Sequence, residues 1–291
     1  MALCCGSGAQ HPGDEFDKLN PSQAHGDMEM AGAGAYGQVG QPGPNGAALK
    51  RSGSSWKVPE NEWYSNQYPQ GMNPENRANF IRKVYGILAF QMSITIAICA
   101  AAMYISPVKG LILGIMTMPG ANWVILGLTF AVLCALQCYK SQFPINYILL
   151  VVFTVLMSLN IAVVCAVYHE MGADVLILQA LVATMVVFVS LSAYALISKT
   201  DFTWMGGMLY TALTGVIVFS FFGAIFGFSG GIFMSYFGVL LFSGFVLYDT
   251  SRILYVYGPD DAIDASIELY LDILNLFLYI LEILSAGQED R

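Results

Sequence analysis

Residues 244–285, GFVLYDTSRILYVYGPDDAIDASIELYLDILNLFLYILEILS, are the stretch that decides the fold of this chain. Two apolar runs within it each carry one acid, Asp249 and Asp272, and a break at 257–261 separates them. Two helices joined by so short a connection must lie antiparallel and adjacent. At about 1.5 Å of rise per residue, both acids lie roughly 9 to 10 Å from the turn. The sequence therefore predicts that the two carboxyl groups face each other at similar depth.

The composition is that of a membrane protein. Hydrophobic residues make up 56% of the 291 positions and charged residues only 11%, against roughly 25% charged residues in soluble domains. The net charge of −8 comes mainly from acids in the N-terminal tail, the 258–268 segment and the C-terminal tip. A basic cluster of the kind that binds nucleic acid is missing from the sequence, so we expect membrane lipid and no nucleic acid as a partner.

Apolar runs long enough to cross a bilayer follow one another from Asn76 onward. We predict an all-α fold, a bundle of seven transmembrane helices occupying residues 76–291. The predicted helices are Phe80–Ser106, Ala121–Tyr139, Ile145–Tyr168, Asp174–Ser198, Phe202–Phe228, Ile232–Tyr255 and Asp264–Ser285. Small residues recur along these runs, which favours close helix packing in lipid.

Residues 1–75 are rich in Gly, Pro, Gln, Asn and Ser. Such a segment cannot bury enough apolar surface to offset the entropy of ordering it, so we predict a disordered tail. Cys4 and Cys5 stand together in this tail, and lipidation of the pair is left open. The other four cysteines lie in apolar runs, where thiols usually pack as small hydrophobic groups.

The distribution of basic residues predicts the orientation of the bundle. With the N-terminus in the cytosol, six basic residues near helix ends fall inside and two fall outside. The inside residues are Arg77, Arg82, Lys83, Lys140, Lys199 and Arg252, and the outside residues are Lys109 and Arg291. We therefore expect a multi-pass membrane protein with a cytosolic N-terminus, in which Asp249 and Asp272 lie toward the cytosolic face.

Two carboxylates that face each other inside a membrane cannot both remain charged, because an ionised carboxylate there costs at least about 2.5 to 3.5 kcal/mol. We expect Asp249 and Asp272 to share a proton and to act as a pH sensor and gate. A local ion pair between Asp249 and Arg252, three residues on, is the alternative. Arg82 and Lys140 are further candidates for the counter-charge, with snorkelling to the lipid headgroups as the alternative for both.

The last predicted helix also carries a polar stripe, in which successive members are three or four residues apart and so share one face. Its members are Glu268, Asp272, Asn275, Tyr279 and Glu282. Carboxylate, amide and phenol oxygens suit a hard cation such as calcium, so this face is a candidate ion path. For Glu282 an interfacial position at the far edge of the membrane is the alternative. The sequence leaves unknown whether any of these residues holds a resident metal.

Four segments resemble the Bax inhibitor-1, or transmembrane Bax inhibitor motif, family: RKVYGILAFQ at 82–91, FPINYILLVVFT at 143–154, LYDT at 247–250 and ELYLDILNLFLYILEIL at 268–284. The Gly/Pro-rich tail is similar to that of its lifeguard branch. The resemblance implies a seven-helix protein of the endoplasmic reticulum or Golgi that leaks calcium in a pH-sensitive way and suppresses cell death. It places the family's paired aspartates on Asp249 and Asp272, and a basic counter-charge near Lys140.

Three functions compete at this point. The first is a calcium leak gated by the aspartate pair, with calcium as the transported ion, no cofactor and no enzymatic activity. The second is a non-conducting scaffold that regulates cell death or stress signalling through partner proteins. The third is an intramembrane aspartyl protease, disfavoured because Asp272 follows Tyr-Leu where that enzyme class has Gly-x-Gly before its second aspartate.

Overall fold

A computed structural model describes residues 50–52, 55–57, 74–116, 118, 120–139, 142–198, 200–227 and 230–289. The internal contacts divide the chain into two units, residues 1–62 and residues 63–291. Most of the predicted tail, with Cys4 and Cys5, lies outside the described residues, and so does Lys140.

Within the first unit, strand β1 (Lys50–Ser52) pairs antiparallel with strand β2 (Ser55–Lys57), with Arg51 opposite Trp56. These six residues belong to the segment that was predicted to be a disordered tail, and strands were not predicted there. Three-residue strands are too short to show the two-residue alternation from which a strand is predicted.

The described part of the second unit is entirely helical, and each predicted helix has a counterpart there. Its elements are α2 (Pro74–Tyr104), α3 (Ser106–Met116), α4 (Ala121–Tyr139), α5 (Ile145–Glu170), α6 (Asp174–Ser198), the 3-10 helix η2 (Thr203–Met205), α7 (Gly206–Phe226), α8 (Gly231–Tyr255) and α9 (Ala262–Glu289). An all-α transmembrane region is therefore confirmed.

Helix α3 was not predicted, because the residues after Pro107 are rich in glycine and were expected to form a connection. The structure ends α2 at Tyr104 and begins α3 at Ser106. Pro107 lies in the first turn of α3, where a missing backbone N–H costs nothing because no intrahelical acceptor exists for it. The proline that stops the first helix thus starts a second one.

Five helical segments are long and apolar enough to cross a membrane: Glu75–Tyr104, Ile145–Glu170, Asp174–Ser198, Thr203–Phe226 and Gly231–Tyr255. Helix α4 is also apolar but shorter, with Trp123–Tyr139 as its apolar part. Helix α9 carries several acids and stays outside this set. The chain is therefore a multi-pass membrane protein by the length and composition of its helices, while crossing by α4 and α9 stays a prediction.

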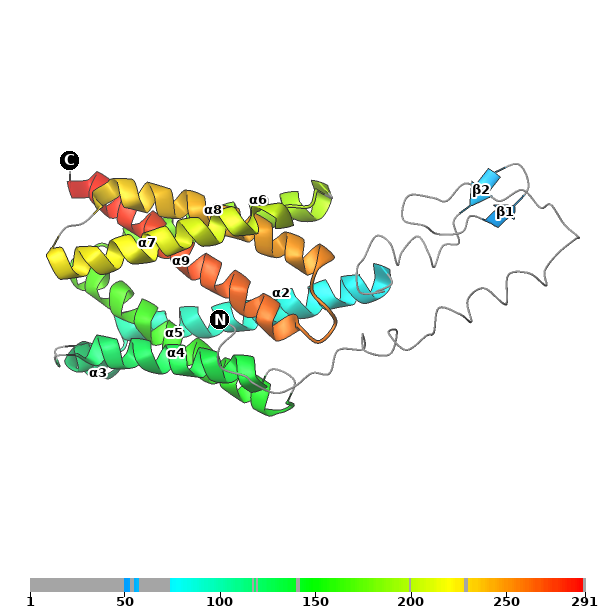
Figure 1. Cartoon of the computed structure of the whole chain (residues 1–291). Helices are drawn as coiled ribbons and strands as arrows, with labels where there is room; N and C mark the ends of the chain where they lie inside the picture. The colour runs from blue at the N-terminus through cyan, green and yellow to red at the C-terminus, as the bar shows by residue number, and fades with distance from the viewer. Residues whose placement is uncertain are drawn as a thin grey trace, which may run out of the picture. The chain divides into compact units, whose positions relative to one another are not determined.

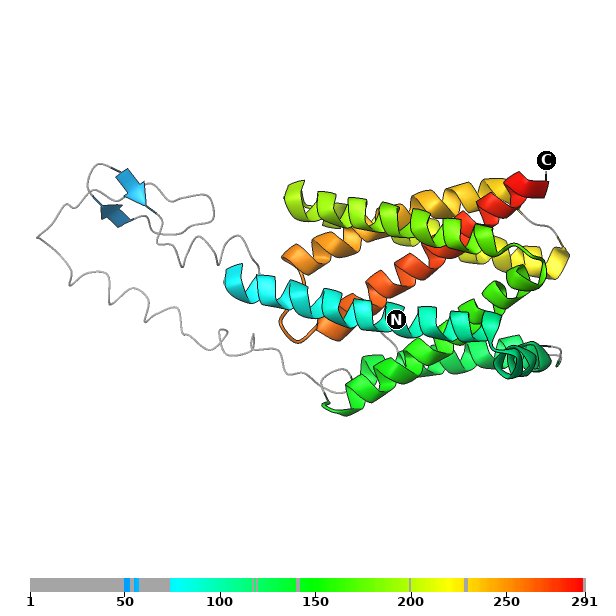
Figure 2. The same cartoon turned by 180° about the vertical axis from the view of Figure 1, so that it is seen from behind.

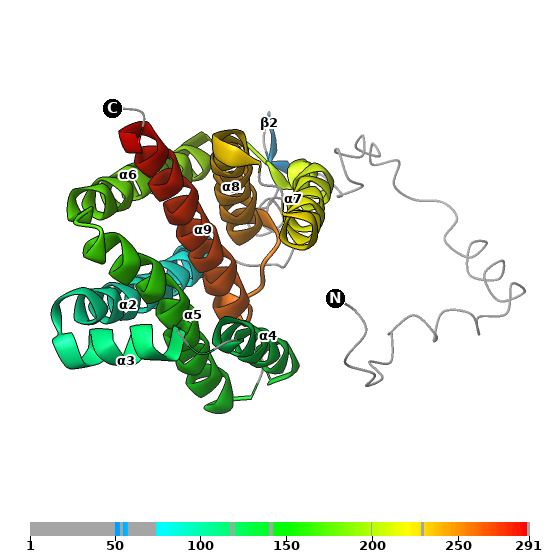
Figure 3. The same ribbon diagram turned by 90° about the vertical axis from the view of Figure 1, so that its left-hand side faces the viewer.

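Helix α9 is the central element of the bundle. It packs against α2, α5, α6 and α8, and Figure 3 shows these helices arranged around it. It crosses the bundle obliquely in Figure 1, and most of its side chains are buried, including Leu269, Tyr270 and Leu276. Helix α7 lies at the edge, where it packs on α8. Asp272 and Ser266 of α9 are consequently held inside protein, whereas Glu282 is exposed.

Helices α2 and α5 lie side by side (Figure 2) along a seam of polar residues. Gln91 donates to the hydroxyl of Thr154 at 3.2 Å, and the hydroxyl of Thr95 lies 2.9 Å from that of Ser158. Both pairs are separated by 63 residues in sequence, so the two helices run in the same direction. The hydroxyl of Tyr270, on α9, joins the seam at 2.8 Å from that of Thr95. These bonds satisfy buried hydroxyl groups and tie α9 to both helices.

The contact between α8 and α9 depends on Gly238. A Cβ atom at this position would lie 2.6 Å from three carbons of the Tyr279 ring, which is closer than packed atoms tolerate. We expect Gly238→Ala to lower the free energy of unfolding by about 1 to 3 kcal/mol, because the ring must move out of its place. Unfolding in a denaturing detergent measures this loss.

Gly215→Ala is the matched control, since a Cβ there meets nothing within 4 Å and Gly215 also lies in a helix. It should leave stability unchanged or raise it by up to about 1 kcal/mol, because alanine favours helix over glycine. Adding Tyr279→Leu to Gly238→Ala should relieve the loss. Equal stability of the two single glycine variants would contradict the packing argument.

Candidate functional site

The structure brings Asp249 and Asp272 together. Asp249 lies three and four residues after the buried Val246 and Phe245, so it shares the buried side of α8 with them. Asp272 lies on the side of α9 that faces α8. Each residue is only 4% exposed. The two carboxyl groups lie close enough to interact directly with each other. The short connection of the helix hairpin therefore places the two acids at the same level.

The second carboxyl oxygen of Asp272, Oδ2, is buried without a donor among the described residues. Ionised carboxylates only accept hydrogen bonds, so two of them cannot bond directly to each other. A pair in this contact can hold one proton between its oxygens, which satisfies both groups. This is the chemistry that the arrangement makes available.

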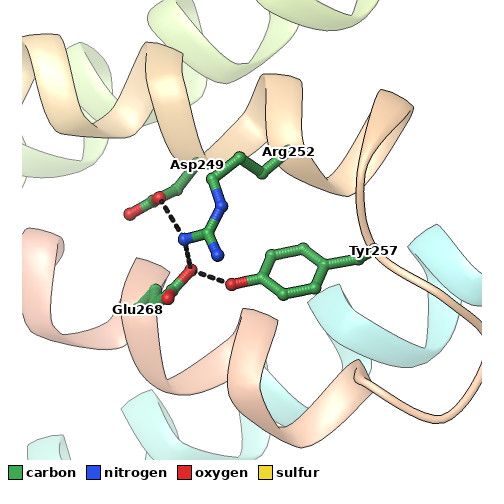
Figure 4. A network of polar contacts seen from close by, with 4 residues as sticks. All are labelled: Asp249, Arg252, Tyr257 and Glu268. Atoms are coloured by element: carbon green, nitrogen blue, oxygen red, sulfur yellow. Dashed lines mark hydrogen bonds and ion pairs between the residues drawn. The ribbon is translucent and has the colours of Figure 1, made fainter. Parts of the chain in front are cut away.

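Arg252 lies between two carboxylates, as Figure 4 shows. Its Nη1 atom donates to Oε2 of Glu268 at 2.6 Å and to Oδ1 of Asp249 at 3.4 Å. The guanidinium group also lies over the rings of Tyr248 and Tyr257, with centroid distances of 5.5 and 4.5 Å. The local contact with Asp249 that the sequence offered as an alternative is present, but the shorter bond goes to Glu268. Arg252 is thus the positive centre of an acidic cluster.

Tyr257, in the connection between α8 and α9, completes this cluster. Its hydroxyl donates to Oε2 of Glu268. Burial, followed by the nearby Glu268 carboxylate, raises the pKa of the Tyr257 hydroxyl above its ordinary value. Tyr257 consequently keeps its proton at neutral pH and remains a donor to Glu268.

A cavity of about 320 Å³ opens beside the cluster. Helices α4, α8 and α9 and the connection between the last two line it, and its walls are Gln137, Arg252, Val256, Tyr257, Asp261, Asp264 and Glu268. The carboxylates make it a polar recess at the hairpin end of α8 and α9. In the part of the chain that the structure describes, His, Cys, Asp and Glu do not gather in a group of three or more that could hold a metal ion.

The rest of the predicted stripe divides into inner and outer members. Asn275 is half-buried, and its amide donates to the carbonyl of Leu271 at 2.8 Å. The ring of Tyr279 stacks on Phe242, with 5.9 Å between the centroids. Glu282 is exposed. Glu268, Asn275 and Tyr279 are thus partly buried, Asp272 is buried, and Glu282 is exposed.

Of the other basic residues proposed as counter-charges, Arg82 is not brought to the aspartate pair. It is exposed and donates to the side chain of Asn79 at 3.5 Å. Lys140 lies outside the described residues. Among the predicted counter-charges that the structure describes, Arg252 is therefore the one in contact with Asp249.

Sequence reasoning missed the role of Arg77, which it used only to orient the bundle. Arg77 is 2% exposed, and its Nη1 atom donates to the carbonyls of Ile253 at 2.9 Å and Tyr257 at 2.7 Å. It thereby caps the carboxyl end of α8, where carbonyl groups lack helical partners. The contacts span 176 and 180 residues of sequence, so a local pattern could not reveal them.

Known proteins resemble this chain over most of its helical region. The model of the family described as "Inhibitor of apoptosis-promoting Bax1" matches residues 77–289. Protein LIFEGUARD 4 of Arabidopsis thaliana is 36% identical over 224 residues, which is 74% of this chain and 88% of that protein. The BI1-like protein of the same plant is 39% identical over 227 residues, 76% of this chain and 86% of that protein.

A viral protein is similar to a comparable extent. The Golgi anti-apoptotic protein of vaccinia virus (strain Lister) is 36% identical over 216 residues, covering 73% of this chain and 87% of that protein. The family match includes the hairpin that carries Asp249 and Asp272, and also Arg77 at its first position. The chain therefore belongs to the Bax inhibitor family, whose model describes inhibitors of apoptosis-promoting Bax1 and whose members include Lifeguard and BI1-like proteins.

Proposed function

We propose that this chain is a pH-sensitive calcium leak channel of an intracellular membrane, gated by the Asp249 and Asp272 pair and linked to suppression of cell death. The observation that supports the proposal most directly is the buried contact between the two carboxyl groups, which belong to adjacent helices. Such a contact joins α8 to α9 only while a proton is shared. The state of one proton thus decides whether the two helices attract or repel each other at this level.

Several charged or titratable groups face this pair and modulate it. Arg252 comes from α8, Glu268 from α9 and Tyr257 from their connection, and Tyr248 of α8 lies against the Arg252 guanidinium. Tyr210, on α7, lies within the electrostatic range of Asp249 and Glu268. A second negative charge on the pair, formed as pH rises, adds to the charge of Glu268, and only Arg252 among these groups opposes it. Repulsion then separates α8 from α9, and acidification restores the closed contact.

The cavity beside Glu268 gives the ion an entrance. Carboxylates of Asp261, Asp264 and Glu268 line it, and Asn275 and Tyr279 continue the polar line inside the bundle. Calcium prefers oxygen ligands of these kinds. Calcium is the cargo in this proposal, and the proton on the aspartate pair decides whether it passes.

A flux assay tests the gate. Vesicles that contain the purified full chain are loaded with calcium, and efflux is compared between wild type, Asp249→Asn and Asp272→Asn at several pH values. Wild-type efflux should fall as pH falls, because the protonated pair holds α8 and α9 together. Either amide variant should lose this pH dependence, since asparagine does not titrate.

Asp260→Asn is the matched control, because Asp260 is an exposed acid in the connection between the two helices. It should keep the wild-type pH profile. Flux in both amide variants that still follows the wild-type pH profile would contradict the proposal.

The link to cell death and the intracellular location draw support from relatives. The family is described by inhibition of apoptosis-promoting Bax1, and the viral relative is named a Golgi anti-apoptotic protein. We therefore extend a Golgi or endoplasmic reticulum location and partners among cell-death regulators to this chain. The distribution of its basic residues supports a cytosolic N-terminus. These names describe cell death and not transport, which favours a non-conducting scaffold as the second candidate. Two results together would count against the scaffold: a chain without its tail still suppresses cell death fully, and the Asp249→Asn variant no longer does.

A further inference from the structure

Cys99 of α2 and Cys165 of α5 form a buried thiol pair. Their side chains interact with each other and line the same cavity, and they are 8% and 2% exposed. Each lies five residues before the last residue of its helix, Tyr104 in α2 and Glu170 in α5. At about 1.5 Å per residue, the pair lies roughly 7 to 8 Å from the helix ends. Because α2 and α5 run in the same direction, the two thiols lie at one level, near the carboxyl ends of both helices.

A cavity of about 110 Å³ leads to this pair. Helices α2, α5, α6 and α9 line it with mostly apolar side chains, among them Ile96, Leu181 and Phe277, and both thiols belong to its wall. Ile96 is 48% exposed on a helix that is long and apolar enough to cross a membrane. The cavity therefore reaches the surface of the bundle that faces lipid, so apolar molecules dissolved in the membrane can approach the thiols.

We infer that Cys99 and Cys165 are an oxidation site at which a lipid hydroperoxide converts two thiols into a disulfide between α2 and α5. The sulfur of one thiol attacks the outer oxygen of the hydroperoxide, the O–O bond breaks, and the lipid leaves as an alcohol. This leaves a sulfenic acid on that cysteine. The second thiol attacks the sulfenic sulfur and expels water. One hydroperoxide is thus reduced to one alcohol and one water while two thiols lose two electrons and form one S–S bond.

The surroundings favour this chemistry over simple packing of two separate thiols. A disulfide needs its sulfurs about 2.05 Å apart, so the side chains of two free thiols must move together before they can bond. Ala102, Ala162 and Ala166 lie buried within a turn of the pair and leave room for that approach. Apolar burial slows the reaction of thiols with oxidants dissolved in water. An oxidant that concentrates in the membrane is therefore the one that fits.

The disulfide would join two of the four helices that line the cavity, and α9 is another of the four. Ile273, Leu274 and Phe277 line this cavity, and Asp272 contacts α8 from a different side of the same helix. Oxidation would therefore fix α2 to α5 on one side of the central helix. The inference stands on the thiol pair and the cavity, and it does not depend on conduction of calcium.

Free thiols report the reaction. The reduced full chain, in lipid nanodiscs, is exposed to linoleic acid hydroperoxide, denatured and labelled with a maleimide that adds mass to each free thiol. We expect the loss of two thiols together, a peptide cross-link between Cys99 and Cys165 by mass spectrometry, and one lipid alcohol per cross-link. Hydrogen peroxide at equal concentration should act more slowly, because it enters the apolar cavity poorly.

Two variants separate this pair from the other described cysteines, Cys134 and Cys138 of α4. Cys99→Ala should abolish the cross-link and retain Cys165, whereas Cys134→Ala combined with Cys138→Ala should leave the cross-link intact. Absence of the cross-link in the wild-type chain would overturn the inference even if a variant failed to fold. Equally fast oxidation by hydrogen peroxide would overturn the assignment of a lipid oxidant.

Discussion

Arg252→Met is expected to lower the free energy of unfolding by about 3 to 5 kcal/mol, because it removes the positive partner of a partly buried cluster. Arg252 contacts Asp249 and Glu268, and its side chain is 19% exposed. Without it, two carboxylates remain close together with Tyr257 as the donor to Glu268. Methionine has a similar length, so the loss reports charge more than volume. Titration with a denaturing detergent measures the change.

A second variant and a surface ion pair make this result interpretable. Adding Glu268→Gln to Arg252→Met removes the second carboxylate and should recover part of the lost stability. Lys109→Met removes one member of an ion pair with Glu170, whose side chain is 51% exposed. Such surface pairs contribute about 0 to 1 kcal/mol, so this control should change stability little. A loss from Arg252→Met no larger than that from Lys109→Met would contradict a structural role for the cluster.

Arg77→Met is expected to lower the free energy of unfolding by about 2 to 4 kcal/mol. Hydrogen bonds from a charged donor contribute roughly 1.5 to 3 kcal/mol, and each of two buried carbonyl groups loses such a bond. The carbonyls belong to Ile253 and Tyr257, at the end of α8. The end of α8 should then loosen first, which amide hydrogen exchange would detect as faster exchange around residues 253–257.

Arg82→Met is the matched control, since Arg82 lies on the same helix but is exposed. It should leave both stability and exchange unchanged. The stability of Arg77→Lys should lie between that of the wild type and that of Arg77→Met, because a lysine ammonium keeps the charge but lacks the planar, forked donor geometry of arginine. Unchanged exchange at the end of α8 in Arg77→Met would show that the two carbonyl contacts do not hold this helix.

Local pattern was sufficient for much of the fold. Apolar runs interrupted by turn residues predicted seven helices, because burial in lipid requires long uninterrupted apolar segments. The short break at 257–261 was enough to predict that Asp249 and Asp272 face each other, since a tight connection leaves two helices few arrangements. Helix α3 escaped prediction because Pro107 can end one helix or begin the next, and its position in sequence does not distinguish these roles.

What the sequence determined by itself is the membrane-embedded helical class, the family and the hairpin with its two acids, because these depend on composition, spacing and local motif. Only the tertiary structure decided that Arg252 binds Glu268 more closely than Asp249, that Arg77 caps α8, and that Cys99 meets Cys165. The Arg77 and Cys99 contacts join helices that are far apart in the chain, and the Arg252 contacts depend on how α8 and α9 pack against each other. Their formation depends on how all the helices pack around α9, which no local stretch of sequence specifies.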